Sequence, residues 1–559
     1  MFLINETLDT NVLVIGGGAA AARAALESSR SGASTLLVTK GTFGSSGTSN
    51  YRVAEAAGFS AAGIHDPEDT PEDHYNDILA AGLGPVREEL ARLVSEEAPK
   101  QVPFLEKLGV EYQRYGNGYL ATKGCFASKF RSMKIYGHGV AIVSALKNAI
   151  MQEPNIQIVE HSMVIDLLVE ENECKGAILL CDDGRLIRVN ARCTILGAGG
   201  AGQLFRDNLN PPDVTGDGYA MAFRAGASIV NMEFMQAGFG IVKPALALFN
   251  SWFWLVDPDL KDETGHSFIP DYLPENIVLS ECIAKKGTHY PFSSRDCSKY
   301  LEISCMKKLN EGGSVFVDLR GTDPSKHKAN KNLSQMWELT KRWMKEEKKI
   351  DLDNDILQIT CVAHAFNGGA LINTKTETTV NRLLAVGENA GGAHGADRLG
   401  GNMFSSGQVF GEIAGRHAAE TAFSSNYKPF SADIQIRNNG TERNQTAREL
   451  FKSIQDLSMN TLLILRSAEG LQHYLSESER IERDLDKCYC SDCSEYRKRQ
   501  EAYNILLVGR LVANAALTRT ESRGSHYRED YPTLGGAEWR KAICQQLING
   551  DPVLTLSEI

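Results

Sequence analysis

The chain has 559 residues, enough for a large core and for more than one domain. Lys and Arg number 59 and Asp and Glu number 70, and this formal charge of −11 argues against a nucleic-acid binder held by a basic face. An apolar fraction of 42% with 23% charged residues excludes wholesale disorder. Two counts stand out, 51 Gly and 12 Cys.

The cysteines do not form the dense pattern of a secreted disulfide framework, and the N-terminus has no basic segment followed by an uninterrupted apolar stretch. We therefore expect reduced thiols and a cytoplasmic protein. The uncharged run that comes closest to a membrane span is Pro244–Val256. It is shorter than the roughly 18 residues that a spanning helix needs, so we expect no transmembrane segment.

The first glycine cluster lies between two predicted strands. Asn11–Ile15 reads as a buried strand, an Ala-rich helix is expected up to Arg30, and Thr35–Val38 reads as the second strand. The turn before the helix has the pattern G-x-G-x-x-A. Glycines there permit a tight turn and a close approach of pyrophosphate, and the helix N-terminus supplies N–H donors. The pattern predicts dinucleotide binding.

The end of the second strand departs from the common dinucleotide pattern. An acidic residue is expected there to hold the ribose hydroxyls. The sequence instead reads Val38-Thr39-Lys40. Either the ribose is held differently or the chain belongs to a particular subfamily.

Four further segments carry the glycine-rich pattern along the chain: 194–203 (TILGAGGAGQ), 215–227, 384–402 and 521–532 (ESRGSHYREDYP). Together they resemble the flavoprotein subunits of succinate dehydrogenase and fumarate reductase, and L-aspartate oxidase. The pair Thr39-Lys40 also fits this superfamily. The resemblance implies an α/β protein with FAD, in which a Rossmann-like FAD-binding domain carries an inserted capping domain and is followed by a C-terminal helical domain.

The residues that the resemblance assigns to FAD lie in the glycine turns, in the loop after Gly41, or where a helix begins. In chain order they are Gly16, Gly18, Ala19, Ala20, Ala21, Thr39, Lys40, Ser46, Gly47, Thr48, Val164, Ala198, Gly199, Gly200, Asp217, Glu388, Arg398, Asn402, Met403 and Ser405. No histidine stands in Ser45–Ser49, where respiratory members bond the flavin covalently, so we expect noncovalent FAD.

The resemblance also implies distinct positions along the cofactor. Lys40 would lie near the adenosine ribose, Val164 near the adenine, Asp217 near the ribityl chain or ring, and Glu388 near the ribityl hydroxyls. Residues 402–406 would cap the flavin at a helix N-terminus, where the helix dipole stabilises a reduced anionic ring.

Two residues are expected to bind a small anionic substrate. Arg398, in the segment 394–402, matches the family's carboxylate-clamping arginine, and a guanidinium pairs with a carboxylate through two parallel hydrogen bonds. His364 matches the substrate histidine that precedes a double glycine. We therefore expect a substrate with at least one carboxylate or similar anion.

Two other substrate positions depart from the family. Gly238 stands where the family has histidine, and the stretch 250–296 lacks the usual setting of the proton-shuttling arginine. His289 and Tyr290 are the preferred replacements, with Lys243, Lys285 and Lys286 also nearby. The run Trp252–Trp254 is either capping-domain core or a stacking surface for a flatter, less charged substrate.

The expected organisation is an FAD domain over 1–238 and 355–425, a capping domain over 239–354 that closes as a lid, and a helical domain with a tail over 426–559. Residues 156–189 read as a β-rich insert, 333–349 as a charged helix, and 450–465 and 503–517 as helices. Cys488, Cys490 and Cys493 leave three alternatives open: a metal site, a redox pair or plain loop thiols. No metal ligand set is predicted.

The predicted activity is hydride transfer between FAD and a carbon of a small carboxylate-bearing substrate, acting on C–C or C–N bonds. The direction, the electron partner and the oligomeric state stay open; a homo-oligomer is compatible with the sequence, and so is an iron–sulfur or other electron-transfer subunit. The alternative is an electron-transfer subunit of an iron–sulfur complex, with a vestigial substrate pocket.

Overall fold

The computed structural model describes residues 4–326, 333–424, 427–432, 434, 436 and 439–559. Its largest sheet has the order β8-β2-β1-β11-β10-β9, with β19 also paired to β11. The strands are β1 (Ile4–Ile15), β2 (Thr35–Val38), β8 (Ile156–Val159), β9 (Ser162–Glu170), β10 (Glu173–Cys181), β11 (Leu186–Leu196) and β19 (Leu383–Ala385). β1 runs parallel to β2 and β11, as the dinucleotide pattern predicts.

Residues 156–189 form strands, as expected, and these strands belong to the main sheet of the FAD domain. β8 extends the main sheet beside β2, and β9 and β10 extend it beyond β11. The apolar alternation predicted the strands correctly, but it carries no information about the sheet that they join.

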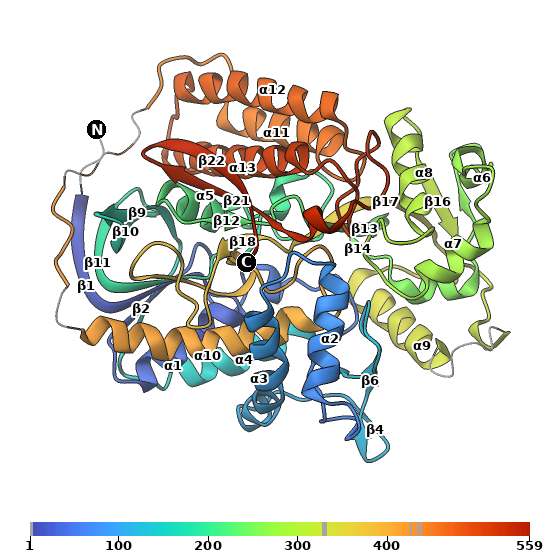
Figure 1. Ribbon diagram of the computed structural model, residues 1–559, viewed down its shortest axis with the longest axis horizontal. Coiled ribbons are helices and arrows are strands. Elements are labelled where there is room, and N and C mark those ends of the chain that lie inside the picture. Colours follow the sequence, from blue (N-terminus) through green and yellow to red (C-terminus); the bar gives the residue numbers. More distant parts are fainter. Residues whose placement is uncertain (1–3, 327–332, 425–426, 433, 435, 437–438) are drawn as a thin grey trace.

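Two helices cover one face of this sheet, α1 (Ala19–Arg30) and α10 (Asn402–Phe423), and they lie side by side in Figure 1. A Cβ at Gly411 would come within 2.7 Å of the Ala20 carbonyl oxygen. Only glycine permits this backbone approach. The close packing brings the N-termini of both helices to the same edge of the sheet.

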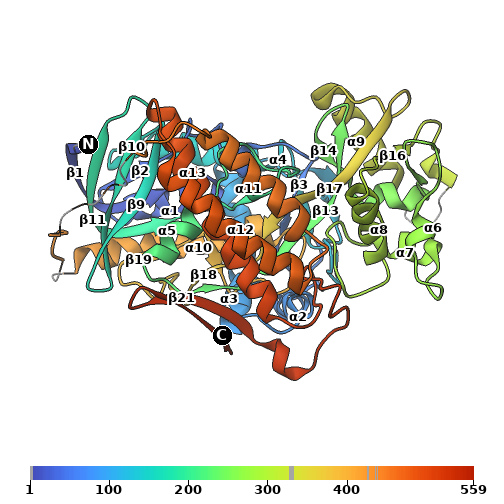
Figure 2. The ribbon, with the colours of Figure 1, turned by 90° about the horizontal axis from the view of Figure 1, so that it is seen from above.

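The capping region forms a separate lobe with its own sheet, visible at one end of the molecule in Figures 1 and 2. The sheet order is β14-β13-β17-β16-β15. Its strands are β13 (Met235–Lys243), β14 (Ala247–Leu248), β15 (Leu260–Lys261), β16 (Val315–Asp318) and β17 (Ile356–Phe366). Helices α6 (Ile269–Tyr272), α7 (Leu279–Lys286), α8 (Lys299–Asn310) and α9 (Leu333–Trp343) surround it. The boundary predicted at residue 238 falls inside β13.

The C-terminal region is helical only in part. α11 (Ala447–Thr461), α12 (Ala468–Lys487) and α13 (Cys493–Thr518) pack together across the FAD domain, as Figure 2 shows from above. The tail then forms β21 (Ala542–Ile548) and β22 (Asp551–Ser557), and β21 pairs with β12 (Ile229–Val230). The expected helices are therefore followed by a tail that forms strands, and this pairing with a distant strand could not be read from local spacing.

The remaining helices and strands of the fold are α2 (Pro71–Gly82), α3 (Glu88–Lys107), α4 (His138–Ile150), α5 (Asp217–Arg224), β3 (Ala57–Ser60), β4 (Arg114–Tyr115), β5 (Gly118–Tyr119), β6 (Ala121–Thr122), β7 (Ser132–Ile135), β18 (Gly369–Leu371) and β20 (Ala390–Gly391).

In the part of the chain that the structure describes, no helix has the length and apolar character that crossing a membrane requires.

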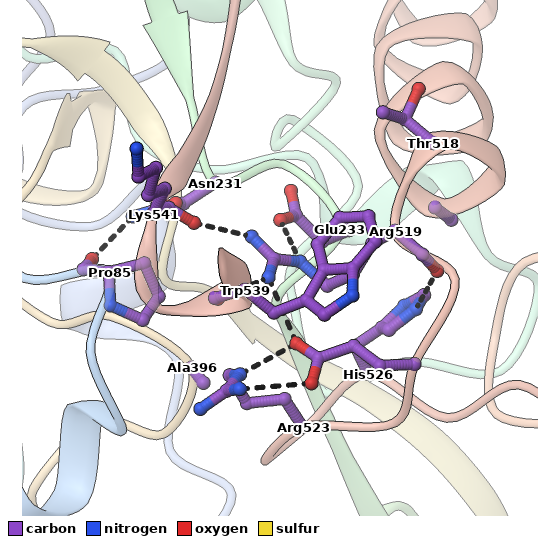
Figure 3. A network of polar contacts seen from close by, with 12 residues as sticks. Pro85, Asn231, Glu233, Ala396, Thr518, Arg519, Arg523, His526, Trp539 and Lys541 are labelled. Carbon is purple, nitrogen blue, oxygen red and sulfur yellow. Dashed lines mark hydrogen bonds and ion pairs between the residues drawn. The ribbon is translucent and has the colours of Figure 1, made fainter. Parts of the chain in front are cut away.

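A buried ion-pair network fastens the C-terminal segment to the FAD domain (Figure 3). The Arg519 guanidinium donates to Glu233 at 2.8 Å, to Glu521 at 3.1 Å, and to the carbonyl oxygens of Trp539 and Lys541. Arg523 donates twice to Glu521, at 2.6 and 2.9 Å. Because the partners come from separate segments, the network joins residue 233 to the chain beyond 519.

Candidate active site

A cavity of about 390 Å³ runs between the glycine turn, the N-terminus of α10 and the capping sheet. Most of the predicted cofactor residues line it: Gly16, Gly18, Ala19, Ala20, Ala21, Thr39, Lys40, Ser46, Gly47, Thr48, Val164, Ala198, Gly199, Asp217, Glu388, Arg398 and Met403. Segments that are separate in sequence thus meet around one space.

One end of the cavity holds a cluster of paired charges. The Lys40 ammonium lies 2.9 Å from Asp217 and 2.7 Å from Glu501 of α13. Burial disfavours the charged lysine, yet the two carboxylates outweigh it and raise the pKa of Lys40. Asp217 therefore lies at the same end of the cavity as Lys40, and its expected place near the ribityl chain or ring stays a prediction. Glu501 lies far along the sequence and no local motif marks it.

Three predicted cofactor residues do not line the cavity but contact residues around it: Gly200, Asn402 and Ser405. Gly200 packs against the Glu388 carboxylate. The Asn402 amide oxygen is 2.9 Å from His74 Nε2, and the Ser405 hydroxyl donates to the Ser60 carbonyl oxygen at 2.7 Å. The side chains of Asn402 and Ser405 hold the α10 N-terminus in place. The sequence motif could not distinguish this supporting position from direct contact.

Glu388 faces the cavity as a carboxyl group with a raised pKa. It accepts a hydrogen bond from the Phe366 N–H at 2.9 Å. Burial raises its pKa to about 7, although the Arg398 charge and this hydrogen bond oppose the rise.

Arg398 and His364 line the same cavity from different elements. Arg398 precedes α10, and its Nη2 donates to Gln236 at 2.9 Å, while its Nε is buried without a partner among the described residues. His364 lies on β17. Burial, together with the Arg398 and His138 charges, lowers the pKa of His364 to about 3, so its imidazole is neutral. The pair offers a cation and a neutral ring to an anion.

Arg295 is the first arginine in the stretch 250–296, where the family's proton-shuttling arginine was sought. It does not line the cavity. Its guanidinium pairs with Asp397 at 2.7 Å and donates to the Ala81 carbonyl oxygen. This arginine therefore anchors the capping lobe beside Arg398.

His289 and Tyr290, the two residues predicted to replace the missing substrate-site side chains, differ in whether they reach the cavity. His289 does not line the cavity: Nδ1 contacts the Pro291 carbonyl oxygen at 2.8 Å, Nε2 contacts Ser298 at 3.3 Å, and the ring lies against Phe126. Both ring nitrogens contact nearby groups of the chain, so the structure gives no support to the prediction that His289 is catalytic. Tyr290 does line the cavity, and its buried hydroxyl has no partner in the described chain.

In the aromatic run 252–254, two residues belong to the core of the capping lobe and one lines the cavity. Phe253 and Trp254 pack in the capping core against Phe249. Trp252 lines the cavity, with its indole N–H donating to Thr340 at 3.1 Å. A three-residue run on a tight 3₁₀ turn cannot place all its rings on one side.

Several cavity residues escaped the sequence interpretation: Cys125, Ser132, Lys134, His138 and Gln236. Ser132 and Lys134 alternate along β7, so period-two spacing in a strand was the available signal. Burial lowers the pKa of Lys134, and the Glu55 charge opposes this.

Two of the three clustered cysteines contact each other, since the side chains of Cys488 and Cys490 are hydrogen-bonded. The Cys493 thiol instead contacts the Cys181 carbonyl oxygen at 3.4 Å. Within the described ranges, no group of three or more His, Cys, Asp or Glu residues could hold a metal ion. All twelve cysteines are free thiols.

Comparison with known proteins decides the family. Residues 11–404 match the FAD binding domain family, and residues 451–557 match the fumarate reductase flavoprotein C-terminal family. The chain belongs to the FAD-binding fumarate reductase flavoprotein family. This confirms the predicted resemblance, the fold class and FAD as the cofactor.

The relatives of this flavoprotein span its whole length. An uncharacterized FAD-dependent oxidoreductase of Methanocaldococcus jannaschii is 31% identical over 555 residues, covering 96% of each chain. A fumarate reductase (CoM/CoB) polypeptide of Methanothermobacter marburgensis is 29% identical, covering 96% and 97%. Among solved structures, Mycobacterium smegmatis Sdh1 in complex with UQ1 has a TM-score of 0.84 at 24% identity, covering 99% and 95%, which supports the fold.

The cavity of this flavoprotein fits FAD on its own geometry. Gly18 caps α1 without a side chain, and a Cβ at Gly47 or Gly199 would meet no protein atom within 4 Å. The turns therefore leave open space where a dinucleotide would lie. Gly401 caps α10 in the same way. The protein is a flavin-dependent oxidoreductase.

Proposed function

We propose that this flavoprotein transfers hydride between FAD and a carbon of a small carboxylate-bearing substrate, acting on a C–C or C–N bond. The observation that carries the proposal is Arg398, whose Nε is buried and unpartnered in the described chain and whose side chain lines the cofactor cavity. A buried guanidinium without a carboxylate partner is costly, and a substrate carboxylate would offset that cost.

FAD supplies the hydride acceptor or donor when bound. Arg398 would hold the substrate carboxylate, and the neutral imidazole of His364 would orient it through one ring nitrogen. The capping lobe, with Trp252 at the cavity wall, would exclude water from the site. Noncovalent attachment of FAD is part of the proposal, because Ser45–Ser49 contains no histidine.

An electron-transfer partner, such as an iron–sulfur subunit, would exchange electrons with the flavin, and the free cysteines support a cytoplasmic setting. The alternative of a relay subunit with a vestigial pocket is less favoured. A vestigial pocket gives no reason to keep the Arg398 Nε and the Tyr290 hydroxyl buried without partners in the described chain.

The test is a titration of the purified yellow protein with small enoates, dicarboxylates and amino acids, followed by flavin absorbance and turnover. Arg398→Met should weaken carboxylate binding by at least about 30-fold, the usual result of removing one member of a buried charge pair. Arg416→Met, an exposed arginine on α10, is the matched control and should bind normally. Unchanged affinity in Arg398→Met would refute the site.

A further inference from the structure

Gly238 and Tyr290 occupy one space. A Cβ built on Gly238 would lie 2.8 Å from Tyr290 Cζ and 3.1 Å from both Cε2 and the hydroxyl oxygen. The phenol ring thus stands beside β13, at the position where the family resemblance predicts a histidine side chain. A side chain at 238 and the ring at 290 exclude each other, so these two residues form a matched pair.

Tyr290 is held firmly in this place. Its backbone N–H donates to the Cys125 sulfur at 3.3 Å, and its ring meets the His364 ring edge to face, with centroids 5.6 Å apart. It also packs in a small apolar cluster with Val53 and Val362. The ring is therefore positioned from three sides, and its hydroxyl direction is defined.

The hydroxyl lacks a partner that its surroundings should provide. It is buried and makes no hydrogen bond within the described chain, which is unfavourable for a polar group. The side chain lines the cavity that also holds Arg398 and His364. A ligand oxygen in that cavity would satisfy the group.

The phenol stays neutral. Burial raises the pKa of Tyr290 well above its usual value, and the nearby Glu302 and the Cys361 and Cys125 thiols add to the rise. Glu302 is itself paired with Lys286 behind the ring. Tyr290 therefore donates a hydrogen bond but supplies no charge.

Part of the wall next to Tyr290 is apolar. Val53 and Leu248 line the cavity and belong to the same apolar cluster as Tyr290. Among the charges that act on the phenol, that of Glu302 contributes most, and it disfavours an anion there. A carboxylate against the phenol would lose its hydration at the apolar wall and meet this negative charge.

We propose that Tyr290 is a specificity-determining residue whose hydroxyl donates to an uncharged oxygen of the substrate. The substrate class is then an acid with one carboxylate, held by Arg398, and an uncharged acceptor such as an ester, ketone or amide carbonyl next to Tyr290. This inference rests on the proposed function and narrows it: a second carboxylate is disfavoured at this end.

The test compares fumarate with monomethyl fumarate, which share a skeleton and differ in one carboxylate. Each is titrated into the oxidised holoprotein and its dissociation constant is read from the flavin absorbance. We expect the monoester to bind at least about tenfold more tightly. Tyr290→Phe should weaken monoester binding by about tenfold, the effect of one hydrogen bond, and leave fumarate within about twofold.

Two further variants separate this role from a structural one. Gly238→Ala drives a methyl group against the ring and should weaken monoester binding while leaving flavin content normal. Tyr112→Phe is the matched control, because the Tyr112 hydroxyl is also buried and has no partner in the described chain, but its side chain does not line the cavity. It should leave both dissociation constants unchanged.

Three outcomes overturn the proposal. Tighter binding of fumarate than of the monoester, with Arg398→Met weakening both, would reject only the assignment of Tyr290. Unchanged monoester affinity in Tyr290→Phe would also reject the assignment of Tyr290 while leaving the proposed function intact. If neither compound perturbs the flavin spectrum and no other carboxylate does, the proposed function fails with it.

Discussion

Buried polar groups have different roles in two regions of this molecule, the C-terminal ion-pair network and the cofactor cavity. In the C-terminal network of Figure 3, Arg519 and Arg523 donate hydrogen bonds to Glu233, Glu521 and backbone carbonyl oxygens. In the cavity, the Arg398 Nε and the Tyr290 hydroxyl are buried with no partner in the described chain. A paired buried charge connects segments of the chain, whereas a buried polar group that lines a cavity and has no protein partner is available to a ligand.

The largest effect on stability should come from breaking the paired region. Arg519→Met leaves Glu233 buried without its arginine, and we expect the free energy of unfolding to fall by about 3–5 kcal/mol. Urea unfolding followed by circular dichroism measures it. Arg540→Met, at an exposed arginine in the same segment, should change it by less than about 0.5 kcal/mol. Equal effects of the two variants would contradict a fastening role.

The cavity carboxyl of Glu388 should show an intermediate, pH-dependent effect. Its pKa is raised to about 7 in the folded protein from an ordinary 4.5. The folded state therefore holds this proton more tightly, and its contribution to stability is full below pH 4.5 and lost as the pH rises to 7. Glu388→Gln should match wild type near pH 4.5 and be more stable by about 2–3 kcal/mol at pH 8.

Chemical unfolding at several pH values tests this prediction. Glu420→Gln, on the exposed face of α10, serves as the control and should show no such pH dependence. If the stability difference between Glu388→Gln and wild type were the same at pH 4.5 and pH 8, the pKa of Glu388 would not be raised in the folded protein.

The smallest effect is expected at Glu501, which behaves in the opposite sense. Lys40 and Lys498 lower the pKa of Glu501 to about 2 against the cost of burial. Its stabilising contribution is present above pH 4.5 and is lost as the pH falls through about 2. Glu501→Gln should destabilise the protein by about 1–2 kcal/mol at pH 7, since Asp217 still pairs with Lys40.

Thermal unfolding at pH 7 and pH 2.5 measures the Glu501 contribution. The difference between variant and wild type should shrink at the lower pH. A difference that grows in acid would show that Glu501 is not stabilised by the two lysines.

Local patterns predicted much of the cofactor side of this protein. The turn at Gly16–Ala21 follows from backbone sterics, because only glycine and small residues permit that turn, and the strand–helix–strand unit around it is confirmed. The positions of Arg398 and His364 on one cavity followed from family motifs. The motifs did not separate Tyr290, which faces the cavity, from the adjacent His289, which does not.

The sequence by itself determined the family, the fold class, FAD and the geometry of the glycine turn, since these depend on contacts between near neighbours in the chain. Tertiary structure alone decided three things: that Glu501 pairs with Lys40, that the tail strand β21 joins β12, and that Tyr290 fills the space beside Gly238. Each joins residues that lie far apart in the sequence. Local spacing constrains neighbours only, and such distant partners are selected by packing and charge when the chain folds.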